Sequence, residues 1–340
     1  MKDRFGRTID YLRISLTDRC NLRCVYCMPE EGVEARSHDD ILSFEEIVRV
    51  VETATKFGIK RLRFTGGEPL VRKGACDLIA ECKHVDGIED VAITTNGILL
   101  PRYADELKAA GVKRVNISLD TLDADTYHAI TRCGNLDEAL RGISTALETG
   151  FNPVKINTVV IRSLHQDLTA FAQMTMDKPL HVRFIEYMPL GSSCASELVR
   201  WDESEVIPLP EMIAIITEGC VAAGLGAPVP LDPADETQQS NIPDGWGPAR
   251  YWKLPGAKGT IGFITSVSDH FCASCNRLRL TADGKLRLCL FSDQELDVHD
   301  ALRNGTQEDL EHLFALALEQ KPKDHDHRLG TDREMVQVGG

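Results

Sequence analysis

Short apolar, β-branched runs alternate with amphipathic stretches over the first 190 residues. The runs predict strands at residues 11–17, 59–67, 90–97, 112–120, 154–162 and 180–189. Stretches with helical periodicity lie between them, at residues 43–58, 74–85, 102–111 and 136–150. Strands that alternate with helices imply a parallel sheet with right-handed crossovers. Because six strands are too few for an eight-stranded barrel, we expect an α/β fold: a partial (βα)6 TIM-like barrel with an open side.

The first predicted helix carries its own end signals. Ser43 stands at its N-cap, Glu46 completes a capping box with Ser43, and Gly58 follows its last turn. These residues support the prediction of a helix over 43–58.

The pattern changes after residue 190. Residues 224–248 are rich in Pro, Gly and Asp, which predicts a long loop or irregular lid. Short strands follow at residues 250–256, 259–267 and 277–291, the last with a turn at Asp283-Gly284. We therefore expect two domains, residues 1–190 and residues 191–340, the second a smaller α+β module that covers the open side of the barrel. A polar tail ends in Gly339 and Gly340.

Composition and charge narrow the class of protein. Hydrophobic residues make up 43% of the chain, and no apolar stretch is long enough to cross a membrane. We therefore expect a cytoplasmic protein with no membrane partner. The net charge of −14 argues against a long DNA or RNA footprint, but it is compatible with a small anion held by a few local arginines.

Six of the eleven cysteines fall into two triplets. The first is Cys20, Cys24 and Cys27, and the second is Cys272, Cys275 and Cys289. Disulfides are rare in a reducing compartment, so clustered thiols indicate metal binding or catalysis. The remaining five are expected to be ordinary core or surface thiols: Cys76, Cys82, Cys133, Cys194 and Cys220.

Each triplet lacks an obvious fourth ligand. Structural zinc sites usually have four protein ligands, whereas a cubane iron–sulfur cluster held by three thiolates leaves one iron open to a small molecule. Two such clusters are the preferred interpretation. A zinc site that takes a histidine from elsewhere remains an alternative, and His270 is available to the second triplet.

Several polar motifs follow the predicted strands at corresponding places. They are "TGGEP" (65–69), "TTNG" (94–97), "SLD" (118–120) and "EYMP" (186–189). In a parallel barrel the carboxyl ends of the strands meet at one face, where active sites lie. We therefore expect these motifs and the first triplet to build one site.

Arg277 and Arg279 lie just beyond the second triplet, two residues apart. In an extended strand both guanidinium groups project from the same face. Their planar geometry suits phosphate oxygens or a guanine carbonyl. The alternative is a charged strand that only faces solvent.

The spacing Cys-x3-Cys-x2-Cys, with Tyr26 before the third cysteine, resembles the signature of the radical S-adenosylmethionine superfamily, and "GGEP" resembles its segment for the methionine end of that cofactor. The set of motifs, from "LRISLTDRCNLRCVYCMPEEG" through "RVNISLDTL" and "RFIEYMPLG" to "FCASCNRLRLTADG", resembles the GTP 3′,8-cyclase family. The resemblance implies a lyase with two 4Fe-4S clusters that converts GTP to 3′,8-cyclo-7,8-dihydro-GTP. That reaction is the first step of molybdenum cofactor biosynthesis, and it needs an electron donor and a downstream cyclic pyranopterin monophosphate synthase.

The resemblance also implies roles for individual residues. The two triplets would hold the clusters. The positions matching S-adenosylmethionine contacts are Tyr26, Gly66, Gly67, Ser118 and Met188, and those matching GTP contacts are Arg13, Arg63, Thr94, Lys155, Arg277, Leu278 and Arg279. The catalytic set would comprise Arg13, Arg277, Arg279, Gly339 and Gly340, the two glycines reaching the site from the tail.

Two other functions remain open on the sequence. A radical maturase acting on a peptide would use an auxiliary cluster but would not predict the Arg277 and Arg279 pair. A non-catalytic, metal-binding regulator of nucleic acid would require a basic face and four-ligand sites. The sequence leaves both a monomer and a homodimer open.

Overall fold

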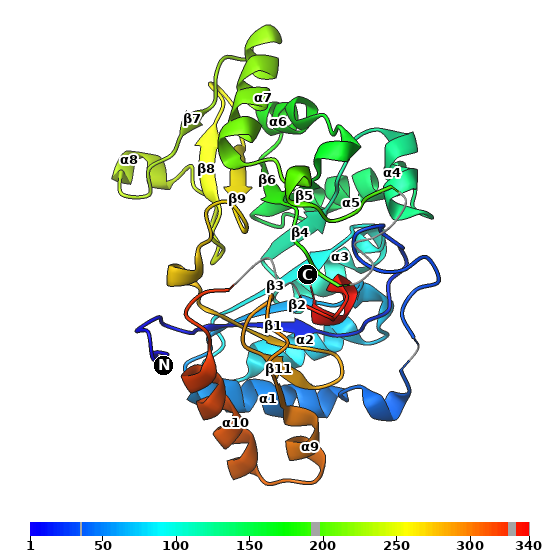
Figure 1. The fold of residues 1–340 in the computed structure, drawn as a ribbon, viewed down its shortest axis with the longest axis vertical. Coiled ribbons are helices and arrows are strands. Elements are labelled where there is room, and N and C mark those ends of the chain that lie inside the picture. Colours follow the sequence, from blue (N-terminus) through cyan, green and yellow to red (C-terminus); the bar gives the residue numbers. More distant parts are fainter. Residues whose placement is uncertain (35, 192–197, 326–330, 340) are drawn as a thin grey trace.

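The computed structural model describes residues 1–34, 36–191, 198–325 and 331–339. Its centre is a curved sheet whose first six strands run parallel and follow chain order (Figure 1). They are β1 (Tyr11–Ser15), β2 (Arg61–Thr65), β3 (Asp90–Thr95), β4 (Arg114–Ser118), β5 (Val154–Val160) and β6 (Leu180–Glu186). The predicted partial barrel is confirmed.

The C-terminal residues lengthen this sheet at both edges. Strand β9 (Thr260–Ile264) pairs in parallel with β6, and β10 (Arg277–Leu280) pairs in parallel with β1. Antiparallel strands complete the edges: β7 (Val229–Pro230), β8 (Arg250–Lys253), β11 (Lys285–Arg287) and β12 (Glu295–Asp297). Because β9 and β10 are not hydrogen-bonded to each other, the eight parallel strands remain an open barrel. The sheet is thus continuous across the predicted boundary at residue 190.

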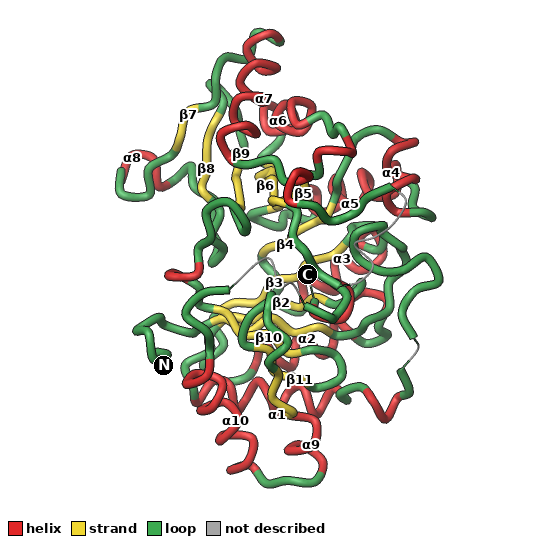
Figure 2. The backbone as a smooth tube through the Cα atoms, in the orientation of Figure 1, coloured by secondary structure: helices red, strands yellow, loops and turns green. Residues whose placement is uncertain are grey.

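Helices cover the outer face of the sheet (Figure 2). In the first half they are α1 (Phe44–Lys56), α2 (Ala75–His84), α3 (Leu100–Ala109), α4 (Ala124–Thr131), α5 (Leu136–Glu148) and α6 (Leu168–Asp177). In the second half they are α7 (Leu209–Ala222), α8 (Glu236–Gln239), α9 (Val298–Arg303) and α10 (Gln307–Gln320), whereas the short helix α11 (Met335–Val338) lies on the inner side of the sheet. Short 3-10 turns lie at His38–Asp40, Pro69–Val71, Arg162–Leu164, Glu203–Glu205 and Cys272–Ser274. The predicted cap of α1 is confirmed, since Ser43 accepts a hydrogen bond from the Glu46 amide.

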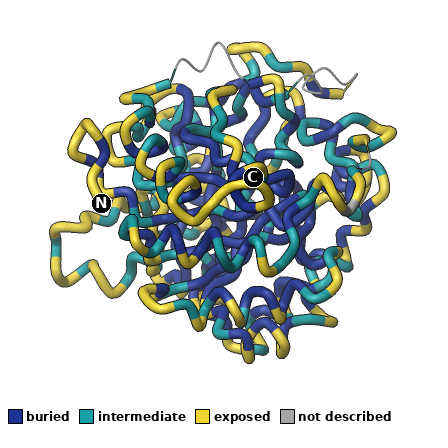
Figure 3. Tube along the Cα trace, turned by 90° about the horizontal axis from the view of Figure 1, so that it is seen from below, coloured by how far each residue is buried: buried dark blue, intermediate teal, exposed yellow. Residues whose placement is uncertain are grey.

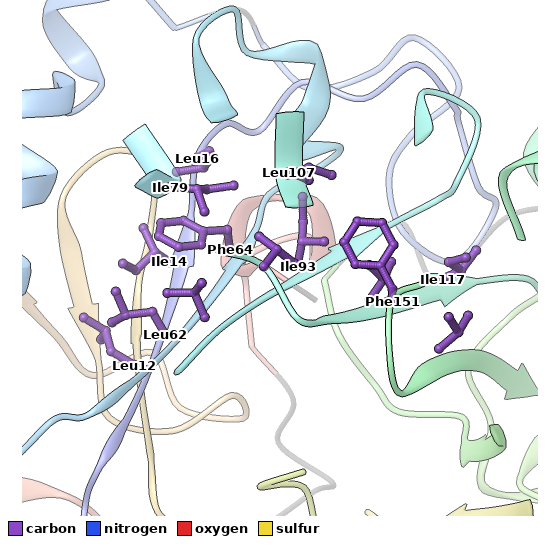
Figure 4. Close-up of a cluster of buried hydrophobic side chains, with 14 of the residues drawn as sticks. Leu12, Ile14, Leu16, Leu62, Phe64, Ile79, Ile93, Leu107, Ile117 and Phe151 are labelled. Atoms are coloured by element: carbon purple, nitrogen blue, oxygen red, sulfur yellow. The ribbon is translucent and has the colours of Figure 1, made fainter. Parts of the chain in front are cut away.

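The strands alternate between an apolar outer face and a polar inner face. Leu12, Ile14, Leu62 and Phe64 point outward and pack with helix residues such as Ile79 in a buried core (Figure 4). The intervening residues of β1 and β2 line the interior of the barrel. Buried segments accordingly run through the middle of the molecule, while exposed ones form its rim (Figure 3). No helix in the described residues is long and apolar enough to cross a membrane.

Candidate active site

Both cysteine triplets line the same cavity inside the open barrel. The cavity has a volume of about 270 Å³ and contains Cys20, Cys24 and Cys27 together with Cys272, Cys275 and Cys289. Residues 252 positions apart in the chain, Cys20 and Cys272, therefore face one space. The fold therefore brings the two triplets to one cavity.

The pairing of β1 with β10 sets the two triplets at opposite ends of the cavity. The first triplet follows the carboxyl end of β1, whereas Cys275 immediately precedes β10, whose first residue pairs with Tyr11 at the start of β1. Cys289 follows β11, which returns antiparallel to β10. A strand of this length spans about 13 Å at about 3.3 Å per residue.

The first cysteine loop is held by the chain around it. The Arg23 guanidinium donates to the carbonyl oxygen of Cys20 at 2.6 Å, and Asn96 donates through Nδ2 to Asn21 at 2.7 Å. Burial raises the pKa of Cys20 to about 11 and that of Cys24 well above its usual value. Buried thiols of this kind become thiolates when a metal binds them, because the metal supplies the missing positive charge.

Glycines 66 and 67 pack against that loop. A Cβ at Gly66 would lie 2.6 Å from the Thr17 carbonyl oxygen, and one at Gly67 would lie 2.4 Å from the Arg19 carbonyl oxygen. Both distances are shorter than any tolerated contact. The sequence suggested that these glycines admit a ligand; the structure adds that they admit the backbone leading into the first triplet. Both still line the cavity.

Tyr26 is fixed by a carboxylate. Its hydroxyl donates to Asp120 Oδ2 at 2.5 Å, and Asp120 Oδ1 accepts from the Val159 amide at 2.8 Å. Burial raises the pKa of Asp120 to about 6. Ser118 and Met188 line the cavity as well, so the residues matched to one cofactor lie around one end of it.

The second triplet lies in a positively charged environment. Burial alone would raise the pKa of Cys275, but the charges of Arg277 and Lys321 lower it to about 6. Lys321 is buried and donates to the Arg277 and Leu288 carbonyl oxygens at 2.7 and 2.6 Å. His325 lies beside Cys272, with 2.9 Å between Nδ1 and Sγ. The positive charges of Arg277 and Lys321 stabilise thiolates, and they therefore favour a cluster bound by three cysteine thiolates.

The thiols of the two triplets are candidate ligands for iron–sulfur clusters. In the described part of the chain, no three His, Cys, Asp or Glu side chains converge closely enough to hold one metal ion. The thiolates that bind one zinc ion all lie about 2.3 Å from the same metal atom. The thiolates that bind a cubane cluster each bind a different iron atom. Each triplet supplies three thiols, which is the donor set of a cubane iron–sulfur cluster with one iron left open.

Cations dominate the inner wall between the triplets. Arg13, Arg63 and Arg183 line the cavity, and the Nε atom of each is buried without a hydrogen-bond partner among the described residues. Arg183 donates to the side-chain oxygens of Asn116 and Asn157, at 2.9 and 2.6 Å, and both of these partners are neutral. Burial lowers the pKa of Arg13 and of Arg63 to about 10. A wall of buried, incompletely paired cations calls for an anionic ligand.

Lys155 lies just outside this wall. It is buried, but it does not line the cavity, and its ammonium donates to the backbone carbonyl of Asp244. Burial, followed by the charges of Arg183 and Arg63, lowers its pKa well below the usual value. Its contact with GTP stays a prediction.

The C-terminal tail enters the site. Val336 and Val338 of α11 are buried, Met335 lines the cavity, and the Gly339 carbonyl accepts a hydrogen bond from Arg279 at 2.5 Å. Figure 1 shows α11 against the inner side of the central strands. Gly340 lies outside the described residues, as does Cys194.

Two family models together cover most of the chain. Residues 14–173 match the radical SAM superfamily, and residues 180–327 match the family described as Molybdenum Cofactor Synthesis C. The GTP 3′,8-cyclase of Pelotomaculum thermopropionicum is 50% identical over 100% of both chains, and that of Petrotoga mobilis is 48% identical over the same share. The chain belongs to the GTP 3′,8-cyclase family.

Solved structures support the fold. Streptococcus suis SuiB bound to S-adenosylmethionine superposes with a TM-score of 0.55 at 15% identity, and SuiB bound to its precursor peptide SuiA with 0.56 at 14%. Each match covers 90% of this chain, while the chain spans only 64% and 65% of the two SuiB chains. As a GTP 3′,8-cyclase family member, the chain is a radical S-adenosylmethionine enzyme whose cofactors are two 4Fe-4S clusters and S-adenosylmethionine.

The sequence individually identified both cysteine triplets and several residues around them, but fewer than half of the residues that line the cavity. Tyr26, Thr94, Arg277 and Arg279 line the cavity as expected, while Leu278 is buried and its side chain does not. Residues that no motif indicated include Asn157, Arg183, Lys321 and His325. Asp120 was quoted within "SLD" and Asn96 within "TTNG", so their motifs were a usable signal. Single polar residues such as Arg183 gave none.

The cationic wall predicts an acid-sensitive barrel. Burial, with the nearby charges of Lys155 and Arg183, lowers the pKa of His181 to about 3, against about 6.5 when unfolded. Below about pH 6.5 His181 binds a proton in the unfolded state but stays neutral in the folded state. The free energy of unfolding therefore decreases as the pH falls below about 6.5. On going from pH 7 to about pH 5, the free energy of unfolding of His181→Gln should therefore decrease by about 2 kcal/mol less than that of the wild type. Urea unfolding of both proteins at pH 7 and pH 5 measures this difference. The prediction would be wrong if the free energy of unfolding decreased by the same amount in the two proteins.

Proposed function

We infer that this chain converts GTP to 3′,8-cyclo-7,8-dihydro-GTP, the first step of molybdenum cofactor biosynthesis. The observation that carries the inference is the single cavity shared by both cysteine triplets and lined with arginines. Full-length relatives at 44–50% identity bear the name GTP 3′,8-cyclase, which agrees with it.

The first triplet and its surroundings suit S-adenosylmethionine. Cys20, Cys24 and Cys27 would hold the cluster, and Tyr26 and Met188 lie on the cavity wall near it. When bound there, the reduced cluster and S-adenosylmethionine supply a radical able to remove hydrogen from a ribose carbon. The chain positions the groups and limits water, with Asp120 holding the Tyr26 hydroxyl in one place.

The opposite end suits the guanine base and the phosphates. Cys272, Cys275 and Cys289 would hold the second cluster, and Arg277 borders both that cluster and the cavity. Arg13, Arg63 and Arg183 offer buried donors to a triphosphate, because no ion pair to a described acidic residue would need to be displaced. A nucleotide held at both ends has one orientation, which keeps its ribose before the first triplet.

The surroundings of the enzyme follow from its chemistry. We place it in the cytoplasm, since none of the ten described cysteines forms a disulfide with another described cysteine, as a reducing compartment favours. An electron donor must reduce the first cluster, and a cyclic pyranopterin monophosphate synthase would consume the product.

Anaerobic turnover tests this function. Reconstituted protein is incubated with S-adenosylmethionine, a reductant and GTP, and the products are identified by mass. The inference expects the cyclised dihydro-GTP together with 5′-deoxyadenosine. Rapid formation of 5′-deoxyadenosine that is indifferent to GTP, with no cyclised nucleotide, would overturn it.

A further inference from the structure

Residues 244–248 lie across the amino-terminal ends of three barrel strands. The Trp246 ring centroid is 3.2 Å from the Arg61 Cζ atom and 5.2 Å from that of Arg114, the first residues of β2 and β4. Its indole nitrogen donates to Asp90 Oδ2, at the start of β3, at 3.0 Å. One side chain thus bridges three adjacent strands at the end of the barrel opposite the first triplet.

The same segment also borders the cavity, at the amino-terminal ends of the strands. Gly247 and Pro248 line the cavity, and a Cβ on Gly247 would lie 3.8 Å from the Arg183 Nη1 atom. Trp246, which precedes them in the chain, faces outward and is 36% exposed. The segment therefore separates the cationic interior from solvent, with one face on each side.

Lys155 joins the segment to the wall. Its ammonium donates to the Asp244 carbonyl, and a Cβ at Gly245 would lie 2.4 Å from its Nζ atom, so the ammonium packs directly against the segment. A neutral carbonyl is a weaker partner for an ammonium than a phosphate oxygen. An anion entering this end of the cavity can therefore draw Lys155 away from the carbonyl.

We propose that residues 244–248 form the end wall of the substrate site for the terminal phosphates, with Trp246 as its anchor. The proposal rests on the function inferred above. Trp246 is a positioning residue: it holds Gly247 and Pro248 against the cavity and keeps water from Arg63, Arg183 and Lys155. Excluding water strengthens the attraction between these cations and phosphate.

The test compares nucleotides that differ only in phosphate number. Anaerobically reconstituted holoenzyme is prepared as wild type, Trp246→Ala, Trp246→Phe and, as a control on an exposed edge strand, Val229→Ala. Equilibrium dialysis measures the binding of GTP and GMP, and iron content is determined for each protein. Trp246→Ala should weaken GTP binding by about tenfold, the loss expected for one charge-assisted contact, and leave GMP binding and iron content unchanged.

The other outcomes are equally decisive. Trp246→Phe retains a ring on Arg61 and should recover most of the GTP affinity; a Phe variant as weak as the Ala variant would overturn the ring as anchor. An equal loss of GTP and GMP affinity, or no loss of either, would overturn the end wall. Wild-type protein that binds neither nucleotide would instead refute the inferred function.

Discussion

Cys289→Ala is expected to abolish the cyclised product while S-adenosylmethionine is still cleaved. Cys289 belongs to the triplet at the start of β10, whereas the first triplet follows the carboxyl end of β1. A cluster lost from one end should therefore leave the other intact. The nucleotide would lose the partner that fixes its base, and without that orientation the ribose carbon no longer meets the radical.

Two measurements check this expectation. Iron content should fall from about eight to about four per chain, and 5′-deoxyadenosine should form without cyclised nucleotide. Cys220→Ala is the matched control, since Cys220 is buried in α7 away from the cavity and should keep all its iron and activity. Loss of S-adenosylmethionine cleavage in Cys289→Ala would contradict the independence of the two ends.

The barrel strands were predictable because their alternation is regular. Each of the six predicted segments contains a strand of the structure, two to four residues shorter than predicted. Helices α4, α6 and α7 were missed for local reasons. Helix α4 is only eight residues long, and α6 and α7 are so apolar that they show no clear polar face.

The attachment of the C-terminal residues could not be read from local pattern. Strands β9 and β10 were recognised as strands, but their partners β6 and β1 lie far away in the chain. Periodicity says which residues form a strand and not which edge it joins. The sequence therefore suggested a module over the open side, where the structure shows two additions to the wall.

The site divides in the same way. The cysteines were found because their spacing is itself the signal, and the "GGEP" and "SLD" motifs followed from their position after strands. Arg183 and Lys321 stand alone in β6 and after α10, and only the folded chain brings them to the cavity. A cation on a strand has no special meaning until its neighbours across the barrel are known.

Gly339→Ala is expected to lower product formation about a hundredfold, the scale of loss that a misplacement of about 1 Å can cause. Gly339 has a φ of +72°, and a Cβ there would lie 2.4 Å from Thr65 Oγ1 and 3.1 Å from Ser15 Cβ. The tail must move away from β1 and β2, so its carbonyl can no longer hold the Arg279 guanidinium at the cavity wall. Misplacing a group at the reacting site costs rate without unfolding the protein.

Gly224→Ala separates this displacement from backbone strain. Gly224 has a nearly identical φ of +75°, but an added Cβ meets nothing within 4 Å. Both variants should therefore lose about 1 kcal/mol of stability in thermal unfolding, the cost of a left-handed alanine. Only Gly339→Ala should lose turnover at saturating GTP, and equal turnover in the two variants would show that the tail does not position Arg279.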